Sequence, residues 1–296
     1  MSFCKEVKNE LIGLRTGWCC KPAMVYGLML FGRAFSIKKI SIQTNNENVA
    51  KAYCNLIKEV YKIEPSLSVG GTARPTYKAE VSSESERLKI LASIDFGIEE
   101  EVIDRTLFLR DCCINSFIRG VFLACGNIND PEKEYRAEFN VKTEKLADEL
   151  LNLLLESGIV MRKVAAKNGF KLYTKESAVI EDLLTLIGAG KQTLNLIDTK
   201  IMKSVKNNIN RARNCDSANI SKTVEASIRQ RTAIEFLEKK GMLYSLPEEL
   251  KSVALLRKEN ESASLKELCR LSNEPISVSG LNHRFEKIIK IYEELK

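Results

Sequence analysis

The residues with the clearest chemical potential lie near the C-terminal end of the sequence, in the segment SVSGLNHRFEKIIK that begins at Ser277. Helical spacing places four polar side chains on one side of this segment: Ser279, Asn282, His283 and Lys287. Asparagine can bond an adenine edge, histidine can donate a hydrogen bond, and serine and lysine can hold phosphates. Arg284 adds a guanidinium that could reach guanine or phosphate. This pattern, with Ser277 as the helix cap, favours a helix that reads double-stranded DNA.

A capped helical hairpin would position these side chains. Ser264 and Glu267 have capping-box spacing at the start of a short helix, and Pro275 stands in the turn that follows it. The second helix would bury one apolar face, made of Val278, Leu281, Phe285, Ile288 and Ile289. This layout is that of a helix-turn-helix, whose second helix enters the major groove. A small helical hairpin that binds another protein has the same pattern, so both interpretations stay open.

The sequence offers little for metal or covalent chemistry. Its one histidine, His283, excludes multi-histidine metal centres. The nine cysteines show no CxxC spacing, so the spacing supports neither a zinc site nor a thioredoxin-like motif. We expect most cysteines to be small buried apolar side chains. The prediction is therefore no catalytic residue, no metal, no cofactor and no small-molecule substrate.

Positive charge is concentrated in the last third of the chain. Of the net +7, residues 200–296 carry 19 basic and 13 acidic side chains, whereas residues 1–199 carry 27 and 26. Between 200 and 213 there are five basic residues and no acidic one. This asymmetry favours an anionic polymer as partner, because basic side chains release counterions from phosphates. The candidates for phosphate contact are Lys200, Lys203, Arg211 and Arg213. A solvated connecting helix is the alternative.

Neither a membrane span nor a secretory signal is predicted. The longest apolar window, 23–35, is shorter than the roughly 18 residues that a span needs. The N-terminus has acidic residues where a signal peptide has a basic start. We expect a cytoplasmic protein without a membrane partner.

One apolar motif occurs twice. CCKPAMVYGLMLFGRAF begins at residue 19 and CCINSFIRGVFLACGNI at residue 112, and their alignment puts Gly27 on Gly120 at an offset of 120 − 27 = 93. Further along, Glu47 aligns with Glu144 at 144 − 47 = 97, which indicates a longer hairpin in the second copy. An internal duplication of this length favours two units packed about a pseudo-two-fold axis.

Each copy is predicted to run helix, hairpin, helix, hairpin, helix, with the doubled motif forming helices over 22–34 and 114–126. The fold class is therefore α+β. We expect a duplicated αββαββα domain over 1–190, with units at about 1–95 and 105–190, then a basic linker over 191–214. An all-α helix-turn-helix domain would occupy 215–296, and its first helix would open with a Ser or Asn cap near 217 and end at Gly241.

The chain resembles the WhiA family of bacterial regulators. The resemblance is carried by NRARNCDSANISKTVEASIRQRTAIEFL with the helical segments after it, by SFCKEVKNEL and by IRGVFLACGNINDPEKEY. It implies that the first domain is like the LAGLIDADG homing endonucleases, in which two units pack through their motif helices. Gly27 and Gly120 would permit close helix packing. The nuclease metal acids would fall on Gly32 and Cys125, and neither suits magnesium. The implication is a protein that is not an enzyme and has lost its nuclease activity; Asp111 and Asp130 lie too far along the sequence to replace the acids.

The resemblance implies a DNA-binding protein in transcription regulation and in cell division, chromosome segregation or sporulation. Its location would be the cytoplasm, in association with the nucleoid. RNA polymerase or cell-division proteins are implied as partners. The alternative is a protein-interaction or nucleoid-associated factor without sequence-specific regulation. The saddle of the first domain could bind DNA through a local basic stripe or could have become a protein-binding surface. That stripe would comprise Lys38, Lys39, Arg162, Lys163, Lys167 and Lys171.

Overall fold

The duplicated sequence folds into two four-stranded antiparallel sheets of one topology. The structure is a computed structural model that describes residues 2–71, 75–94 and 102–296. The first sheet has the order β1(Ala34–Ser36), β2(Lys39–Thr44), β4(Thr76–Val81), β3(Ser66–Gly70). The second has the order β5(Gly126–Ile128), β6(Ala137–Val141), β8(Gly169–Thr174), β7(Arg162–Ala166). The α+β class predicted from the sequence is confirmed, and the expected first unit's end near residue 95 lies outside the described residues.

The hairpins explain why the two copies change their offset. Residues 37–38 alone join β1 to β2, whereas 129–136 join β5 to β6. The longer loop of the second copy accounts for the shift from 93 to 97 that the alignment shows. The register is the same in both sheets, since Ile42 pairs with Ala79 and Phe139 with Leu172. All four of these side chains are buried toward the helices.

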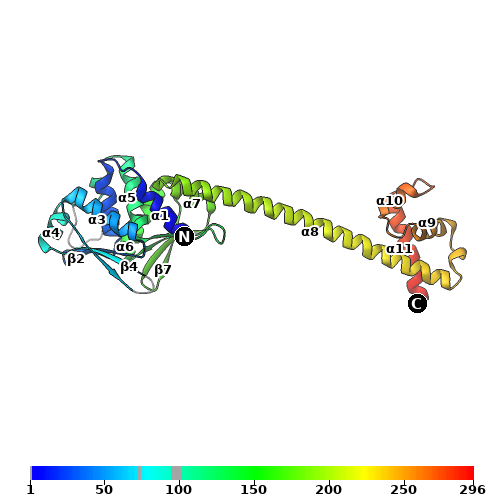
Figure 1. Cartoon of the computed structure of the whole chain (residues 1–296). Coiled ribbons are helices and arrows are strands. Elements are labelled where there is room, and N and C mark those ends of the chain that lie inside the picture. Colours follow the sequence, from blue (N-terminus) through cyan, green and yellow to red (C-terminus); the bar gives the residue numbers. More distant parts are fainter. Residues whose placement is uncertain (1, 72–74, 95–101) are drawn as a thin grey trace. The chain divides into compact units, whose positions relative to one another are not determined.

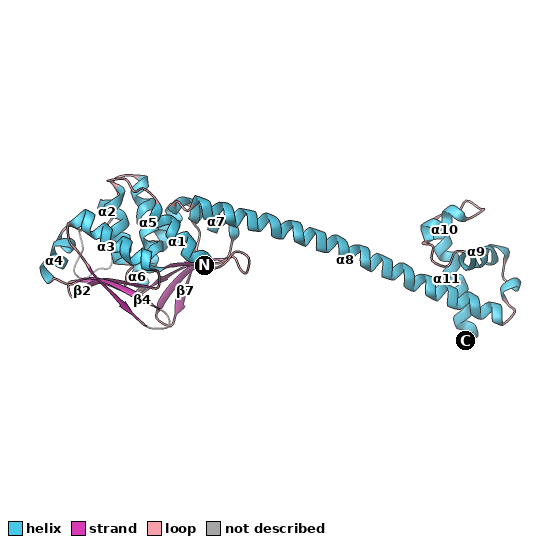
Figure 2. Ribbon diagram, in the orientation of Figure 1, coloured by secondary structure: helices cyan, strands magenta, loops and turns pink. Residues whose placement is uncertain are grey.

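Seven helices accompany the two sheets in this part of the described chain. They are α1(Phe3–Gly13), α2(Cys20–Leu30), α3(Glu47–Tyr61), α4(Glu84–Ala92), α5(Asp111–Cys125), α6(Glu144–Glu156) and α7(Ser177–Ile187). Figure 2 shows these seven helices on one side of the sheets. Helix α1, which the sequence reading did not predict, is amphipathic and buries Val7 and Leu11.

The doubled motif forms the centre of this unit, because α2 and α5 pack directly on each other. A Cβ built on Gly27 would lie 2.5 Å from the carbonyl oxygen of Phe117. A Cβ on Gly120 would lie 2.2 Å from the carbonyl oxygen of Met24. Real Cβ atoms do not approach backbone oxygens this closely. Glycine at both positions is therefore what lets the two helix backbones meet.

The chain divides into two units, Met1–Lys203 and Ser204–Lys296. Helix α8(Gly190–Lys239) contains the whole of the expected linker 191–214, which is therefore helical (Figure 1). The cap predicted near residue 217 is wrong, since the helix has already begun there. The predicted helix end at Gly241 is close to the observed one, because α8 ends at Lys239 and Gly241 adopts a left-handed φ of 72°.

The second unit is all helical in its described secondary structure. After α8 come a 3-10 turn η2(Leu243–Ser245) and three helices, α9(Glu248–Glu259), α10(Leu265–Leu271) and α11(Val278–Leu295). Its core is a separate cluster of buried side chains: Ala233, Ile234, Leu237, Leu243, Leu250, Val253, Ala254, Leu268, Leu281, Phe285 and Ile288. The unit thus has an apolar core of its own, as an independent domain requires.

Candidate nucleic-acid interface

Helices α10 and α11 form the predicted helix-turn-helix, and both begin at well-made caps. The Ser264 hydroxyl accepts a hydrogen bond from the backbone N–H of Glu267 at 3.3 Å, and the Glu267 carboxylate accepts one from the Ser264 N–H at 2.7 Å. The Ser277 hydroxyl accepts the Gly280 N–H at 3.1 Å and so starts α11. Ser277 is therefore engaged as a helix cap, which fixes where the exposed residues after it stand.

The buried face of α11 is close to the predicted one. Leu281, Phe285 and Ile288 are fully buried, and Ile289 is half-buried against the same core. Val278 departs from the prediction, because it is 45% exposed. It occupies the first position of the helix, where the chain has only just left the turn.

The opposite face of α11 presents the predicted reading residues. Ser279, Asn282, His283 and Lys287 are all exposed. The side chains of Asn282 and His283 make no hydrogen bond to any residue that the structure describes. Their donors and acceptors are free to bind a base edge.

Arg284 is held differently from its neighbours. Its guanidinium is half-buried and pairs with Glu274 at 3.5 Å and with Glu249 at 3.8 Å. Both carboxylates are largely exposed, so the pairs are weak and could be exchanged for a phosphate or a guanine. In the free protein, however, Arg284 braces α11 against the turn and α9.

A buried arginine anchors this domain from within. Arg257 of α9 is 2% exposed, and its guanidinium donates to the Gln230 side-chain oxygen at 3.0 Å and to the Ala263 carbonyl at 2.5 Å. It also lies over the Phe285 ring, 5.4 Å from its centroid. Burial lowers the pKa of Arg257, and the nearby charge of Arg231 lowers it further. Arg257 therefore connects α8, the loop before α10 and helix α11.

The four candidate phosphate contacts on α8 fall into two pairs. Lys200 forms an ion pair with Glu181 at 2.8 Å, and Lys203 donates to the Pro131 carbonyl at 2.8 Å. Arg211 and Arg213 are exposed and have no side-chain partner among the described residues. The second pair is consequently the better placed for phosphates.

The positions expected to match the nuclease metal acids are Gly32, which closely follows α2, and Cys125, the last residue of α5. A Cβ on Gly32 would meet the carbonyl oxygens of Leu28 at 2.9 Å and Ser41 at 3.0 Å, so an acid cannot enter there without moving backbone. Cys125 is half-buried, and burial raises the pKa of its thiol to about 12. At neutral pH it is a neutral thiol, whereas magnesium needs carboxylate oxygens.

Two lysines, which the sequence reading missed, occupy this neighbourhood. Lys142 donates to the carbonyl oxygens of Gly32 and Arg33, the latter at 2.5 Å. Lys8 donates to the Leu123 carbonyl at 3.2 Å, and burial lowers the pKa of its ammonium. A positive group at each helix end complements the helix dipole and opposes a divalent cation. Only the packing of distant segments brings these lysines here.

The two aspartates closest in sequence lie elsewhere. Asp111 is the first residue of α5, at the opposite end from Cys125 and about 21 Å away at the usual helical rise. Asp130 follows β5, where its carboxylate accepts the Glu132 N–H at 3.0 Å. Asp130 is thus used to shape the β5–β6 loop.

On the open face of the two sheets, the cations on or beside the central strands are already paired. In the first sheet, Glu80 forms ion pairs with Lys78 and, at 3.7 Å, with Lys39. The second sheet repeats the arrangement, since Glu138 pairs with Arg136 at 3.1 Å and with Lys171 at 3.3 Å. A carboxylate at the centre of each sheet offsets the positive charge around it.

The expected basic stripe is also incomplete. Lys163 pairs with Glu144 at 3.0 Å and with Asp148 at 2.5 Å, and both acids belong to α6. Lys163 therefore faces the helices, so its place in the stripe was predicted wrongly. Successive side chains of a strand point to opposite faces of the sheet, and Lys163 and its neighbour Arg162 in β7 thus lie on different faces.

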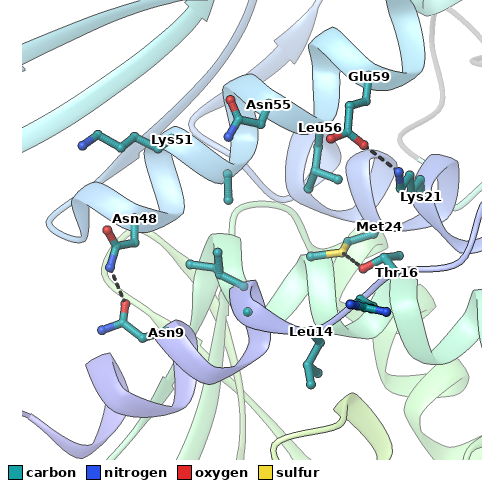
Figure 3. A pocket seen from close by; sticks show the side chains of 14 residues that line it. Asn9, Leu14, Thr16, Lys21, Met24, Asn48, Lys51, Asn55, Leu56 and Glu59 are labelled. Atoms are coloured by element: carbon teal, nitrogen blue, oxygen red, sulfur yellow. Dashed lines mark hydrogen bonds and ion pairs between the residues drawn. The ribbon is translucent and has the colours of Figure 1, made fainter.

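A pocket of about 670 Å³ lies among α1, α2 and α3 (Figure 3). Part of its polar lining is paired within the pocket. Asn48 donates to the Asn9 side-chain oxygen at 3.1 Å, and Lys21 pairs with Glu59 at 2.7 Å. The lining has no pair of carboxylates or activated nucleophile, so we do not place the function there.

The cysteines differ from expectation in one respect. Cys19, Cys20, Cys112 and Cys113 are not scattered core residues, since their sulfur atoms all lie within 4.8 Å of one another. The two aligned Cys-Cys pairs were a signal in the sequence, but the usual spacing patterns of metal sites describe cysteines that are close together in the chain.

Comparison with known proteins bears on both units. A model of the WhiA C-terminal HTH domain matches residues 209–292, and a model of the WhiA LAGLIDADG-like domain matches residues 114–206. A protein of Oceanobacillus iheyensis named probable cell division protein WhiA is 36% identical; the match covers 100% of this chain and 98% of that protein. A protein of the same name from Clostridium botulinum is 34% identical, with 100% and 99% covered.

Solved structures agree with the fold. Full-length WhiA from T. maritima superposes with a TM-score of 0.62 at 26% identity, over 99% of both chains. The N-terminal LAGLIDADG domain of WhiA gives a TM-score of 0.50 at 23% identity, over 63% of this chain and 92% of that one. Within the described residues, no helix has the length and apolar composition needed to cross a bilayer.

Proposed function

The chain belongs to the WhiA family, and on that premise we propose that it is a non-enzymatic DNA-binding protein of transcription regulation. Its cellular role would be in cell division and chromosome segregation or sporulation, at the nucleoid. The relatives named probable cell division protein support the first part of this role. RNA polymerase or cell-division proteins as partners belong to the same proposal.

The observation that carries the proposal is the exposed face of α11. Asn282 and His283 stand in the first turns of a well-capped helix, where a major-groove helix presents its base-reading residues. Ser279 and Lys287 lie on the same side of α11, and with the Ser277 end of the helix they would hold the DNA backbone. Arg284 would join the contact by exchanging its carboxylate partners for DNA.

Affinity without sequence preference is assigned to α8. Arg211 and Arg213 are exposed cations of its basic segment without a side-chain partner among the described residues, whereas Lys200 and Lys203 would first have to leave their partners. The saddle of the first unit contributes less in this account, because Glu80 and Glu138 neutralise its central cations. A protein-binding role for that face fits its charge better than a role in gripping DNA.

Loss of nuclease activity is supported by the nuclease metal positions. Gly32 has no room for an acid, Cys125 is a neutral thiol, and Lys8 and Lys142 bring positive charge to the helix ends. Chemistry that depends on magnesium between carboxylates lacks its ligands here. Supercoiled plasmid incubated with the protein and Mg²⁺ or Mn²⁺ should remain uncut. Nicking that scales with protein concentration and requires the divalent cation would overturn this part.

The binding proposal is tested by fluorescence anisotropy with a selected duplex and with a scrambled duplex. Asn282→Ala should weaken binding to the selected duplex by about 1–3 kcal/mol, or roughly 5- to 150-fold in Kd, and leave the scrambled one nearly unchanged. Asn55→Ala, an exposed helical asparagine of the other unit, is the matched control. Equal losses on both duplexes would favour the alternative, a nucleoid-associated or protein-interaction factor without sequence reading.

A further inference from the structure

Two pairs of adjacent cysteines meet at the N-terminal ends of α2 and α5. Because α2 and α5 pack at Gly27 and Gly120, the cysteine pairs at the two helix starts are brought side by side. The Cys19 sulfur lies 3.7 Å from the Cys20 sulfur and 3.9 Å from the Cys112 sulfur. All four sulfur atoms, with that of Cys113, lie within 4.8 Å of one another.

These distances match the edges of a tetrahedral thiolate site. A zinc–sulfur bond of about 2.3 Å in tetrahedral geometry places the sulfurs about 3.8 Å apart. The separations of 3.7 Å and 3.9 Å fall close to that value, and a separation at the 4.8 Å bound needs a contraction of only about 1 Å to reach it. A disulfide would bring two sulfurs to about 2.05 Å, much nearer than any distance observed here.

The two inner thiols point from one cysteine pair toward the other, and two helix N-termini face the cluster. The Cys20 thiol donates to the Cys112 carbonyl at 3.4 Å, and the Cys113 thiol donates to the Cys19 carbonyl at 3.3 Å. Each inner thiol therefore points across the pseudo-two-fold axis at the other pair. Helix α2 begins at Cys20 and α5 at Asp111, so the positive ends of two helix dipoles face the cluster.

The four cysteines differ in exposure, so the cluster is partly enclosed and still accessible to an ion from solvent. Cys20 and Cys113 are buried, Cys19 is half-buried and Cys112 is exposed. The inner two would be shielded from water and from oxidation, while the outer two leave a path by which an ion can enter. No other group of three or more potential metal ligands comes together among the described residues.

We propose that Cys19, Cys20, Cys112 and Cys113 bind one thiophilic divalent cation, Zn²⁺ in the cell, as a structural Cys₄ site. Four thiols each lose a proton and four zinc–sulfur bonds form, which completes a closed tetrahedral shell. An iron–sulfur cluster fits less well, because it spreads its four thiolates over more than one iron and so holds them further apart. The ion would join the two copies of the duplication at the helix ends opposite the nuclease metal positions.

The direct test is the metal content of the full-length protein, purified without chelator and measured by mass spectrometry of the elements. We expect about one zinc per chain. The variant Cys19→Ser with Cys112→Ser should lose it, whereas Cys215→Ser, an exposed cysteine of the other unit, should retain it. Both replaced ligands have exposed or half-buried side chains, so circular dichroism should show that the variant is folded.

Absorption spectroscopy distinguishes a four-thiolate site from nonspecific metal binding. Co²⁺ added to the zinc-free protein should give the thiolate-to-metal charge-transfer bands and the intense d–d bands of a tetrahedral ion, saturating at one equivalent. Zn²⁺ should bleach these bands and raise the unfolding temperature, and neither effect should occur in the double variant. Zinc-free protein with no Co²⁺ spectrum would overturn the proposal. A Cys19–Cys112 disulfide found by peptide mass spectrometry in protein kept under reducing conditions would also overturn it.

Discussion

Replacing Gly120 by alanine tests the central packing of the duplicated fold. The added Cβ would lie 2.2 Å from the Met24 carbonyl oxygen and 3.1 Å from the Leu28 nitrogen. Relief requires α2 and α5 to separate by about 1 Å, because van der Waals contact begins above 3 Å. Both opposing atoms belong to backbone in a buried helix, so no side chain can rotate away.

The cost should be at the upper end of the range for overpacking, about 3 kcal/mol. For a unit of this size, each kcal/mol lowers the unfolding temperature by roughly 2–4 °C, so the first unit should unfold about 6–12 °C lower. The assay is differential scanning calorimetry of the full-length protein. Hydrogen exchange of peptides from α2 and α5 identifies which unit has been destabilised.

Gly13→Ala is the matched control, since a Cβ there meets no atom within 4 Å. At the end of α1 the alanine should leave stability unchanged or raise it by up to about 1 kcal/mol. If Gly120→Ala unfolds at the same temperature as Gly13→Ala, with unaltered exchange in α2 and α5, the close approach of the two helices is refuted.

Three other variants give measurable outcomes. Arg257→Met removes the buried guanidinium but keeps an apolar side chain. It should destabilise the second unit by about 2–4 kcal/mol, because the hydrogen-bond partners of the guanidinium are left unsatisfied. Urea unfolding measures this loss, and an unchanged free energy of unfolding would contradict the anchor role of Arg257. The double variant Arg211→Gln with Arg213→Gln should weaken binding to all duplexes. The slope of log K against log salt concentration should become shallower by the equivalent of about two phosphate contacts. An unaltered slope would mean that this segment of α8 does not contact DNA. For Glu138, burial raises the carboxyl pKa, but the hydrogen bonds from its two cationic neighbours outweigh this and hold it below the ordinary 4.5. Its contribution to the free energy of unfolding is therefore present above pH 4.5 and lost as the pH falls through the lowered pKa. Glu138→Gln should be less stable than the original at neutral pH and equal to it in acid; a constant difference across that range would contradict the ion-pair account.

The elements with strong local signals were predictable. The duplication, the two motif helices and the caps of α10 and α11 follow from periodicity and from short-range patterns such as Ser264 with Glu267. Helix α8 was predicted as two elements, a linker followed by a helix, because Ser and Asn near residue 217 suggest a helix cap. Ser and Asn also occur inside exposed helices, where nothing in the local sequence distinguishes the two situations.

What the sequence did not show depends on contacts between distant segments. Lys8 and Lys142 lie far from each other in the chain and reach the motif-helix ends only after folding. The cysteine cluster forms only because α2 and α5 pack in register. The two Cys-Cys pairs lie 93 positions apart (112 − 19 = 93), and their alignment alone does not establish that register. Arg284 looked like a free reading residue, yet it is paired with two glutamates from outside its own helix.

The most direct test of the central claim is selection of bound duplexes from a random-sequence DNA library at two salt concentrations, with the original chain and with Asn282→Ala compared in parallel. The account predicts that the original chain enriches one short motif at both salts, and that the variant binds DNA with the same salt dependence but no longer enriches the position that Asn282 reads. Enrichment of the same motif by both proteins, or of no motif by either, would contradict the claim that α11 reads DNA.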